Sequence, residues 1–227
     1  MSEIRIIPIK GLPEIVPGDD IAELVAGCAG EPLTHNDVVV VAQKIVSKSE
    51  DRFVPAGDRG RVIEAAAARI LRRSGEMIIA ETHHGFVCAN AGVDGSNVPG
   101  DKLLLLPADP DLSARRIRAR LEDLLGVRLG VVVSDTFGRA WRLGQTNIAI
   151  GVAGFEPFVD LRGATDAGGR ELTATRICVA DEIAAAAEMV MGKINAVPVA
   201  VVRGASVAWG RGSARDIVRP FGQDLFR

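Results

Sequence analysis

Short, continuous runs of apolar residues recur along this chain, and they constrain its fold more than any other feature. Val38–Ala42 and Leu129–Val133 are the clearest examples. Runs of this length without polar residues are typical of strands that are buried on both faces. Less regular patterns predict further strands at Ile4–Ile9, Met77–Ala80, Phe86–Ala89, Asp101–Leu106, Asn147–Val152, Phe158–Leu161 and Val197–Val202.

Amphipathic segments between these runs predict helices. Asp20 is a suitable N-cap for a helix that ends near Ala29, because its carboxylate can accept from the first free backbone N–H groups. Three more helices are predicted: the alanine-rich segment Arg59–Arg73, a segment from Asp111 or Ser113 to Leu125 that Gly126 ends, and Asp181–Met191.

Strands and helices mix without a regular βαβ rhythm, which favours a mixed α/β (α+β) fold over a doubly wound one. The sequence has no GxxxxGK[ST] loop and no GxGxxG after a strand, so we expect neither a P-loop nor a Rossmann core. With 227 residues, the chain is long enough for one domain spanning residues 1–227, with room for two subdomains.

Composition excludes several classes of protein. The net charge of −2 provides no basic field for nucleic acid or an anionic membrane. The three cysteines are far apart and odd in number, which favours reduced thiols over a zinc site or disulfides. No apolar run approaches the roughly 18 residues of a membrane span, and the N-terminus lacks a signal-peptide pattern. We therefore expect a cytoplasmic protein.

The first segment suited to chemistry is Ala89–Asn97, which follows a predicted strand. It contains Asp94 among asparagines, a serine and two glycines that let the backbone turn tightly. A carboxylate in such a loop is a hard oxygen ligand, suited to Mg²⁺ or Mn²⁺. An Asx-type turn, in which Asp94 caps backbone N–H groups, explains the same residues equally well, and both interpretations stay open.

The second segment is Ser134–Thr146, which we predict to be a polar, glycine-rich loop after a buried strand. Ligand sites favour the carboxyl ends of strands. Asp135 and Thr136 are adjacent oxygen donors for a metal, and Arg139 and Arg142 are spaced to bracket an anion. A surface loop with solvated arginines is the less favoured alternative.

Two weaker signals concern cations and histidines. Lys44 and Lys48 follow a buried strand and could meet phosphate charge, although ordinary exposed lysines are the more frequent case. His83 and His84 are adjacent, and neighbouring side chains on a strand face opposite ways, so a structural role is favoured over shared metal binding.

Among the remaining acids, Asp181 and Glu182 open a predicted helix, where carboxylates complement the helix dipole. A structural role is favoured for both.

Paired carboxylates with arginines and lysines, in a chain without a P-loop, fit phosphoryl transfer assisted by a divalent ion. We therefore assign Asp94, Asp135, Arg139 and Arg142 as candidate catalytic residues. The residues alone do not identify the acceptor.

Five stretches together resemble one family, the γ-glutamyl ligases that extend coenzyme F-420, a deazaflavin hydride carrier. They are GLPEI, IVSKSE, HGFVCANAGVDGSN, SDTFGRAWRLGQTNIAIG, and ADEIAAAAEMVMGK with PVAVVRG. The resemblance extends from Ile4 to about Gly204. It implies a two-subdomain mixed α/β fold and an intertwined homodimer.

The resemblance also implies an activity. Such ligases use GTP to convert the terminal carboxylate of F-420-0 into an acyl phosphate, which the amine of L-glutamate attacks to give an amide, GDP and phosphate. They require Mg²⁺ or Mn²⁺, and K⁺ often helps.

Matching motifs imply metal binding by Asp94 and Asp135, with Thr136 as a neighbouring ligand. The implied nucleotide-binding residues are Leu12, Pro13, Glu14, Ile15, Gln43, Lys44, Lys48, Asn97, Met191, Gly192, Lys193, Ile194, Asn195, Ala196, Val197 and Pro198.

The chain departs from the family that it resembles in two respects. Some relatives carry at position 193 a Gln that could ligate a second metal ion, and a protonated Lys193 cannot do so. Some relatives also continue into a nitroreductase-like domain, which we do not expect here. There are two alternative functions. The protein is a related ligase with another carboxylate or amine substrate, or it is a non-catalytic GTP-binding protein.

Overall fold

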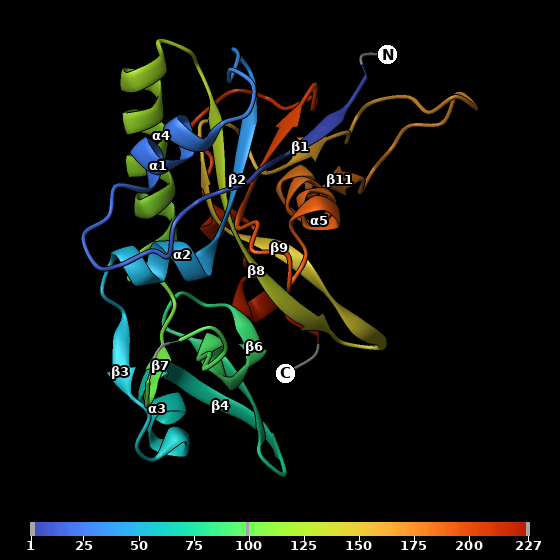
Figure 1. Ribbon diagram of the computed structural model, residues 1–227. Helices are drawn as coiled ribbons and strands as arrows, with labels where there is room; N and C mark the ends of the chain where they lie inside the picture. The colour runs from blue at the N-terminus through green and yellow to red at the C-terminus, as the bar shows by residue number, and fades with distance from the viewer. Residues whose placement is uncertain (1–2, 99, 226–227) are drawn as a thin grey trace.

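The computed structural model describes residues 3–98 and 100–225, and its largest element is a five-stranded sheet (Figure 1). Strands β2 and β8 are parallel, and the other neighbouring pairs are antiparallel. The strand order is β1 (Arg5–Ile9), β12 (Val199–Arg203), β2 (Val38–Ala42), β8 (Gly130–Arg139) and β9 (Arg142–Ala153).

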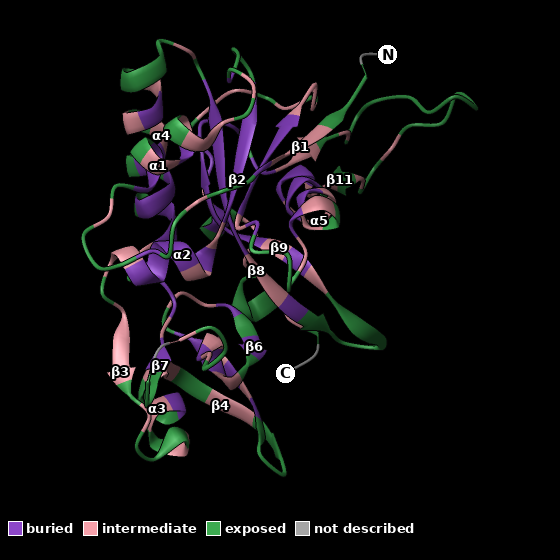
Figure 2. Ribbon diagram, in the orientation of Figure 1, coloured by how far each residue is buried: buried purple, intermediate pink, exposed green. Residues whose placement is uncertain are grey.

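Helices cover both faces of this sheet. In Figure 1, α1 (Ile21–Cys28) and α4 (Pro110–Leu125) lie on one face and α5 (Val179–Met191) lies on the other. Alternate valines of β2 and β8 enter the two resulting cores, so that both strands are buried on both faces (Figure 2). The continuous apolar runs therefore reflect burial from both sides, as the sequence predicts.

A smaller part of the molecule lies beyond the end of the large sheet, below α2 (Gln43–Ser49) in Figure 1. It has its own apolar cluster, which includes Ile63, Ile78 and Leu103. Its elements are β3 (Phe53–Pro55), α3 (Arg59–Ala66), β4 (Ala67–Ser74), β5 (Met77–Thr82), β6 (Val87–Ala89), the 3-10 turn Asn90–Gly92 and β7 (Lys102–Leu104).

The remaining elements are short. Strands β10 (Val159–Asp160) and β11 (Arg176–Ile177) pair at the base of a long projecting arm, which Figure 1 shows in orange. Two 3-10 turns, Ala214–Asp216 and Phe221–Gln223, lie in the otherwise irregular C-terminal segment.

The structure confirms the predicted mixed α/β class. Three of the four pairings in the large sheet are antiparallel, so the sheet is not doubly wound. The predicted cap Asp20 accepts from two backbone N–H groups of α1, and Gly126 ends α4 with a φ of 66°. Helix α4 begins at Pro110, slightly before the predicted start, because Asp109 is its N-cap and proline suits the first helical position. The division into subdomains stays a prediction.

The predicted helix Arg59–Arg73 is wrong in its second half. Helix α3 ends at Ala66, and the chain continues as β4, which pairs with β5 through a turn at Gly75. Alanine and arginine favour a helix locally, but pairing with β5 satisfies the backbone and lets Ile70 pack on the smaller apolar cluster. Pairing of β4 with β5 therefore outweighed the local helix propensity of this segment.

The predicted loop Ser134–Thr146 is also wrong, because this segment forms most of a β-hairpin. Strand β8 continues through Asp135 to Arg139, and β9 returns from Arg142 after the two-residue turn Ala140–Trp141. The cross-strand ladder supplies partners for the backbone groups of this polar segment, so its many polar side chains do not require a loop.

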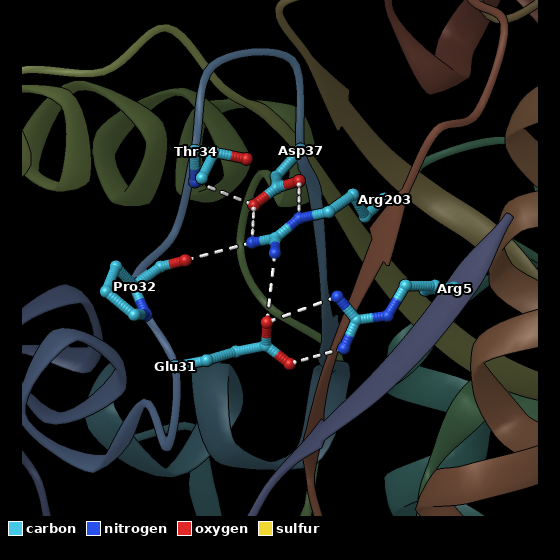
Figure 3. A network of polar contacts seen from close by, with 6 residues as sticks. All are labelled: Arg5, Glu31, Pro32, Thr34, Asp37 and Arg203. Atoms are coloured by element: carbon cyan, nitrogen blue, oxygen red, sulfur yellow. Dashed lines mark hydrogen bonds and ion pairs between the residues drawn. The ribbon is translucent and has the colours of Figure 1, made fainter. Parts of the chain in front are cut away.

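A network of ions joins β1, β12 and the loop before β2 (Figure 3). Arg203 forms two bonds to the carboxylate of Asp37, of 2.8 and 2.7 Å, and also contacts Glu31 at 3.0 Å. Asp37 is only 1% exposed, whereas the outer pair of Arg5 and Glu31 is largely solvated. The hydrogen bonds that Arg203 donates to Asp37 raise the pKa of Arg203 above its ordinary value. Arg203 is thus the compensating charge for a buried carboxylate.

Candidate active site

A cavity of about 1130 Å³ lies at the carboxyl ends of the parallel strands β2 and β8. Its wall combines the loop before α1, helix α2, the segment that carries Asp94, the β8–β9 hairpin and the end of α5. Pockets for a single small ligand have roughly 300–1,000 Å³, so this cavity lies just above the usual range.

Most residues singled out in the sequence meet in this cavity. They are Leu12, Pro13, Glu14, Ile15, Gln43, Lys44, Lys48, Asp94, Asn97, Asp135, Thr136, Met191, Gly192, Lys193, Ile194, Ala196, Val197 and Pro198. Arg139, Arg142 and Asn195 do not line it. Both arginines are exposed at the end of the hairpin, where Arg139 contacts the carbonyl oxygen of Leu143 at 3.4 Å.

The backbone around Asp94 turns tightly, as its glycines indicate. Gly92 has a φ of 73°, and a β-carbon there would lie 2.7 Å from the side chain of Leu106. The carboxylate of Asp94 accepts the backbone N–H of Ser96 at 2.6 Å, which is the Asx-type turn that the sequence allows. Its other oxygen lies 2.8 Å from Lys44 Nζ and is the one oriented toward a cation. The turn therefore leaves one oxygen of Asp94 paired with a positive charge in the cavity.

Asp94 is held in its ionised form. Burial by itself would raise its pKa, but hydrogen bonds from Lys44 and Ser96, and the charge of Lys44, keep the pKa below its ordinary value. An ionised carboxylate is the form that binds a metal.

The electrostatic environment of Asp135 is different. Burial raises the pKa of Asp135 to about 6, against the effects of the Thr136 N–H and the charges of Lys193 and Lys44. The negative charge of Asp94 raises it further, so the two carboxylates affect each other. A buried carboxylate near a second carboxylate gains stability from a bound cation.

Lys44 and Lys48 reach the cavity because the segment after β2 is a helix. They are one turn apart on α2, so both side chains project from the same side. Lys48 is 5% exposed and forms an ion pair with Glu14 from the loop before α1. Lys44 contacts Asp94 and the hydroxyl of Ser96, the latter at 2.7 Å. The lysines are thus fixed cations of the cavity rather than freely solvated side chains.

Several polar residues of the wall were not predicted from the sequence, including Asn147 and Glu188. Asn147 joins the hydroxyl of Thr136 to the carboxylate of Glu188, with bonds of 2.5 and 2.8 Å. Asn147 lies opposite Thr136 in the β8–β9 ladder. The contact between Thr136 and Asn147 depends on the hairpin register, which the sequence does not specify. The distance of Glu188 along the sequence from these two residues does not indicate a contact with either.

The donor set fits a hard divalent cation. Asp94, Asp135 and Thr136 offer oxygen ligands, the kind that Mg²⁺ and Mn²⁺ prefer. Within the described residues, no group of three or more His, Cys, Asp or Glu side chains is placed to hold a metal. Few protein ligands suit Mg²⁺, which commonly keeps waters and binds substrate phosphates.

The raised pKa of Asp135 predicts how metal binding depends on pH. We expect Mn²⁺ affinity to fall about tenfold per pH unit as the pH drops below about 6, because the metal must then displace a proton. Calorimetric titration with Mn²⁺ on both sides of this pKa measures the effect. An affinity that stays constant across that range would contradict Asp135 as a ligand.

In the metal-free protein, the same group has the opposite effect on stability. The folded state binds the proton of Asp135 more tightly than the unfolded state, whose pKa is near 3.8. This group therefore adds stability as the pH falls from above 6 toward 3.8, and removes it as the pH rises through that window.

The adjacent residues His83 and His84 both lie outside the cavity wall, as their structural interpretation predicts. His84 stacks on Phe86 with ring centroids 5.8 Å apart, and its Nε2 lies 3.1 Å from the carbonyl oxygen of Ala108. Asp181 also has a structural contact, because its carboxylate accepts the backbone N–H of Ala149 at 2.9 Å.

The three cysteines are free thiols, as expected. Cys88 lines the cavity, where burial and then the charge of Asp135 raise its pKa to about 12. It is therefore a neutral thiol at physiological pH. Within the described residues, no helix is both long and apolar enough to span a bilayer.

Fold and site together define a mixed α/β protein with a large cavity, lined by both polar and apolar residues, at the ends of two parallel strands. Residues 10–69 and 58–204 match the family described as F420-0:Gamma-glutamyl ligase. The chain belongs to this family.

Full-length relatives support the assignment. The chain is 39% identical over 251 residues to the protein named Coenzyme F420:L-glutamate ligase of Methanothermobacter thermautotrophicus, covering 99% of each chain. It is 40% identical over 251 residues to the protein of the same name from Methanopyrus kandleri, covering 100% of this chain and 99% of the relative. The protein of that name from Methanocaldococcus jannaschii is 39% identical over 249 residues, with the same coverage.

Proposed function

We propose that this protein joins L-glutamate to coenzyme F-420-0 in a GTP-dependent reaction. The observation that carries the proposal is the convergence of Asp94, Asp135, Lys44 and Lys48 in one cavity of about 1130 Å³. Family membership and the names of the relatives support L-glutamate and coenzyme F-420-0 as the two molecules that are joined. The cavity volume suits a reaction in which nucleotide, carboxylate and amine must be held together.

The proposed reaction has two steps. A carboxylate oxygen of F-420-0 attacks the γ-phosphorus of GTP, and the bond from that phosphorus to the bridging oxygen breaks, which gives an acyl phosphate and GDP. The amine of L-glutamate then attacks the acyl carbon, loses a proton and expels phosphate to leave the amide. The second step needs no further nucleotide, because the acyl phosphate already carries the leaving group.

The residues have distinct proposed roles. Asp94, Asp135 and Thr136 would hold Mg²⁺ or Mn²⁺, which when bound neutralises phosphate oxygens. Lys44 and Lys48, one helical turn apart on α2, would stabilise negative charge that develops on the phosphates. Asn97 and the remaining residues of the wall, Leu12–Ile15, Gln43 and Met191–Pro198, would contact the nucleotide. A supporting K⁺ ion is part of the proposal without a binding site assigned to it.

The test uses purified protein with GTP, Mn²⁺, L-glutamate and F-420-0. We expect phosphate release only when both glutamate and F-420-0 are present, and a glutamylated product by mass spectrometry. Amide formation with a different carboxylate or amine would favour a related ligase. An active relative, assayed under the same conditions, is the control. GTP binding without turnover by this protein would then favour a non-catalytic function.

We also propose a homodimer, in which the β8–β9 hairpin contacts the partner. Two large apolar side chains at its end support this: Leu143 is 100% exposed and Trp141 is 87% exposed. Such residues in proximity are typical of interaction surfaces. Arg139 and Arg142 share the hairpin, so their predicted catalytic role would require it to reach a partner's cavity.

Light scattering after size exclusion tests the dimer. The wild-type protein is expected to have twice the mass of one chain, and Leu143→Glu is expected to shift it toward the monomer by placing a charge in the interface. Leu225→Glu, which changes an equally apolar and 89% exposed residue elsewhere, is the control and should stay dimeric. A wild-type monomer at all concentrations would contradict the proposal.

A further inference from the structure

Four polar side chains form a continuous chain of contacts along one wall of the cavity. Asn147 is 3% exposed, and its amide lies between Thr136 on β8 and Glu188 on α5. Lys193, just after α5, donates from Nζ to the same Thr136 oxygen and lies 4.0 Å from Glu188 Oε1. Thr136 and Asn147 belong to the β8–β9 hairpin and Glu188 and Lys193 to the end of α5 and the segment after it, so only the tertiary fold joins the two pairs.

The chemistry of the two ends fixes the direction of every proton in between. A carboxylate only accepts, so Asn147 must direct its NH₂ group at Glu188 and its carbonyl oxygen at Thr136. Thr136 must then donate its proton to Asn147. An ammonium only donates, so Lys193 also requires a lone pair from Thr136. Both ends impose the same orientation.

The consequence concerns what Thr136 presents to the cavity. Its proton is directed at Asn147 and one lone pair accepts from Lys193, so the oxygen has one lone pair left to offer to the cavity. An oxygen in this state attracts a cation and repels a phosphate oxygen. Its neighbour in sequence is Asp135, a candidate metal ligand on the same wall.

We propose that Glu188 and Asn147 are positioning residues that keep the Thr136 oxygen oriented as an acceptor for a cation in the cavity. The inference rests on the proposed function in one respect, since it takes the cation to be the divalent ion of the ligase reaction. Groups that orient a metal ligand through hydrogen bonds commonly affect metal affinity as strongly as some ligands do.

Glutamine at position 188 should disturb this chain with almost no change in shape. In Glu188, one oxygen accepts from Asn147 and the other faces Lys193. Glutamine has one acceptor and one donor group. Its NH₂ group must therefore face the Lys193 ammonium, or else face Asn147 and reverse the amide, which turns the Thr136 proton into the cavity.

The first measurement is Mn²⁺ affinity in the presence of GDP, obtained from the electron paramagnetic resonance signal of free Mn²⁺. Glu188→Gln is expected to weaken binding about tenfold. Glu182→Gln makes the same chemical change on an exposed residue of the same helix, outside the cavity wall, and is expected to bind like wild type. Equal affinity of Glu188→Gln and wild type would overturn the proposal.

A double-mutant cycle separates positioning from general damage. Glu188→Gln should lose its effect in a Thr136→Val background, which has no hydroxyl to orient, and keep its tenfold effect in a Thr136→Ser background. The same loss of affinity in both backgrounds would overturn the proposal by showing that Glu188 acts independently of the hydroxyl.

The outcome is distinguishable from a failure of the proposed function. A wild-type protein that binds Mn²⁺ with the expected cycle but forms no amide would contradict the ligase reaction alone. A wild-type protein that binds no Mn²⁺ would contradict both proposals.

Discussion

Changing Asp135 to asparagine is expected to lower kcat/KM for the ligase reaction at least about 100-fold. Loss of a group that merely orients a metal ligand already costs about 10–100-fold, and Asp135 is proposed to bind the metal itself. An amide carries no negative charge to hold the cation against the phosphates. The measurement is steady-state phosphate release at saturating F-420-0 and L-glutamate over a range of Mn²⁺ concentrations.

This change should leave the fold intact. Burial raises the pKa of Asp135 to about 6, so the ionised carboxylate is unfavourable in the metal-free folded state at neutral pH. Removing it should leave the thermal midpoint of the metal-free protein unchanged or higher. Asp160→Asn is the control, because that carboxylate pairs with Arg162 outside the cavity wall. Near-normal activity of Asp135→Asn at ordinary metal concentration would contradict the assignment.

Changing Arg203 to methionine is expected to lower the free energy of unfolding by about 3–5 kcal/mol. The substitution keeps a long side chain but leaves the carboxylate of Asp37, 1% exposed, with no cation bonded to it. Removing one partner of a buried ion pair has a cost of this size because the other charge stays buried. Guanidinium unfolding followed by circular dichroism gives the value if the transition is two-state.

Two further variants identify the cause. Arg5→Met removes the outer ion pair with Glu31, which is largely solvated, and should cost less than about 1 kcal/mol. Adding Asp37→Asn to Arg203→Met should recover part of the lost stability, since no buried charge is then left. If Arg203→Met costs no more than Arg5→Met, the network is not the stabilising feature that its burial indicates.

The central strands and several helix ends could be predicted because their causes are local. Val38–Ala42 is a strand with the predicted bounds, and Asp20 and Gly126 cap helices as predicted. A run of valines, a capping carboxylate and a glycine at positive φ each act within a few residues. Such features can be recognised in the sequence without knowing which other strands or helices the segment contacts.

The acidic motifs were informative about the site for a different reason. Each motif offers a carboxylate, a hard oxygen ligand, and both Asp94 and Asp135 line the cavity. Asp135 lies on β8 of the large sheet and Asp94 follows β6 of the smaller part, so only the tertiary fold brings them to one cavity. The helical state of Gln43–Ser49 was not predicted, although it decides that Lys44 and Lys48 project together.

The hairpin shows where such prediction failed. The segment after Val133 is polar, and polarity alone favours a loop. Pairing of β8 with β9 instead makes it a strand, aligns Thr136 with Asn147, and carries Arg139 away from the cavity. The same kind of pairing turned the end of the predicted helix Arg59–Arg73 into β4.

The sequence by itself determined the mixed α/β class, the buried central strands, the family and most residues of the cavity wall. Only the tertiary structure decided the hairpin, the contact of Asn147 with Glu188 and the position of the two arginines. The physical reason is the range of the interactions. Periodicity and caps report forces within a few residues, whereas strand register and hydrogen-bond direction depend on contacts between separate strands and helices.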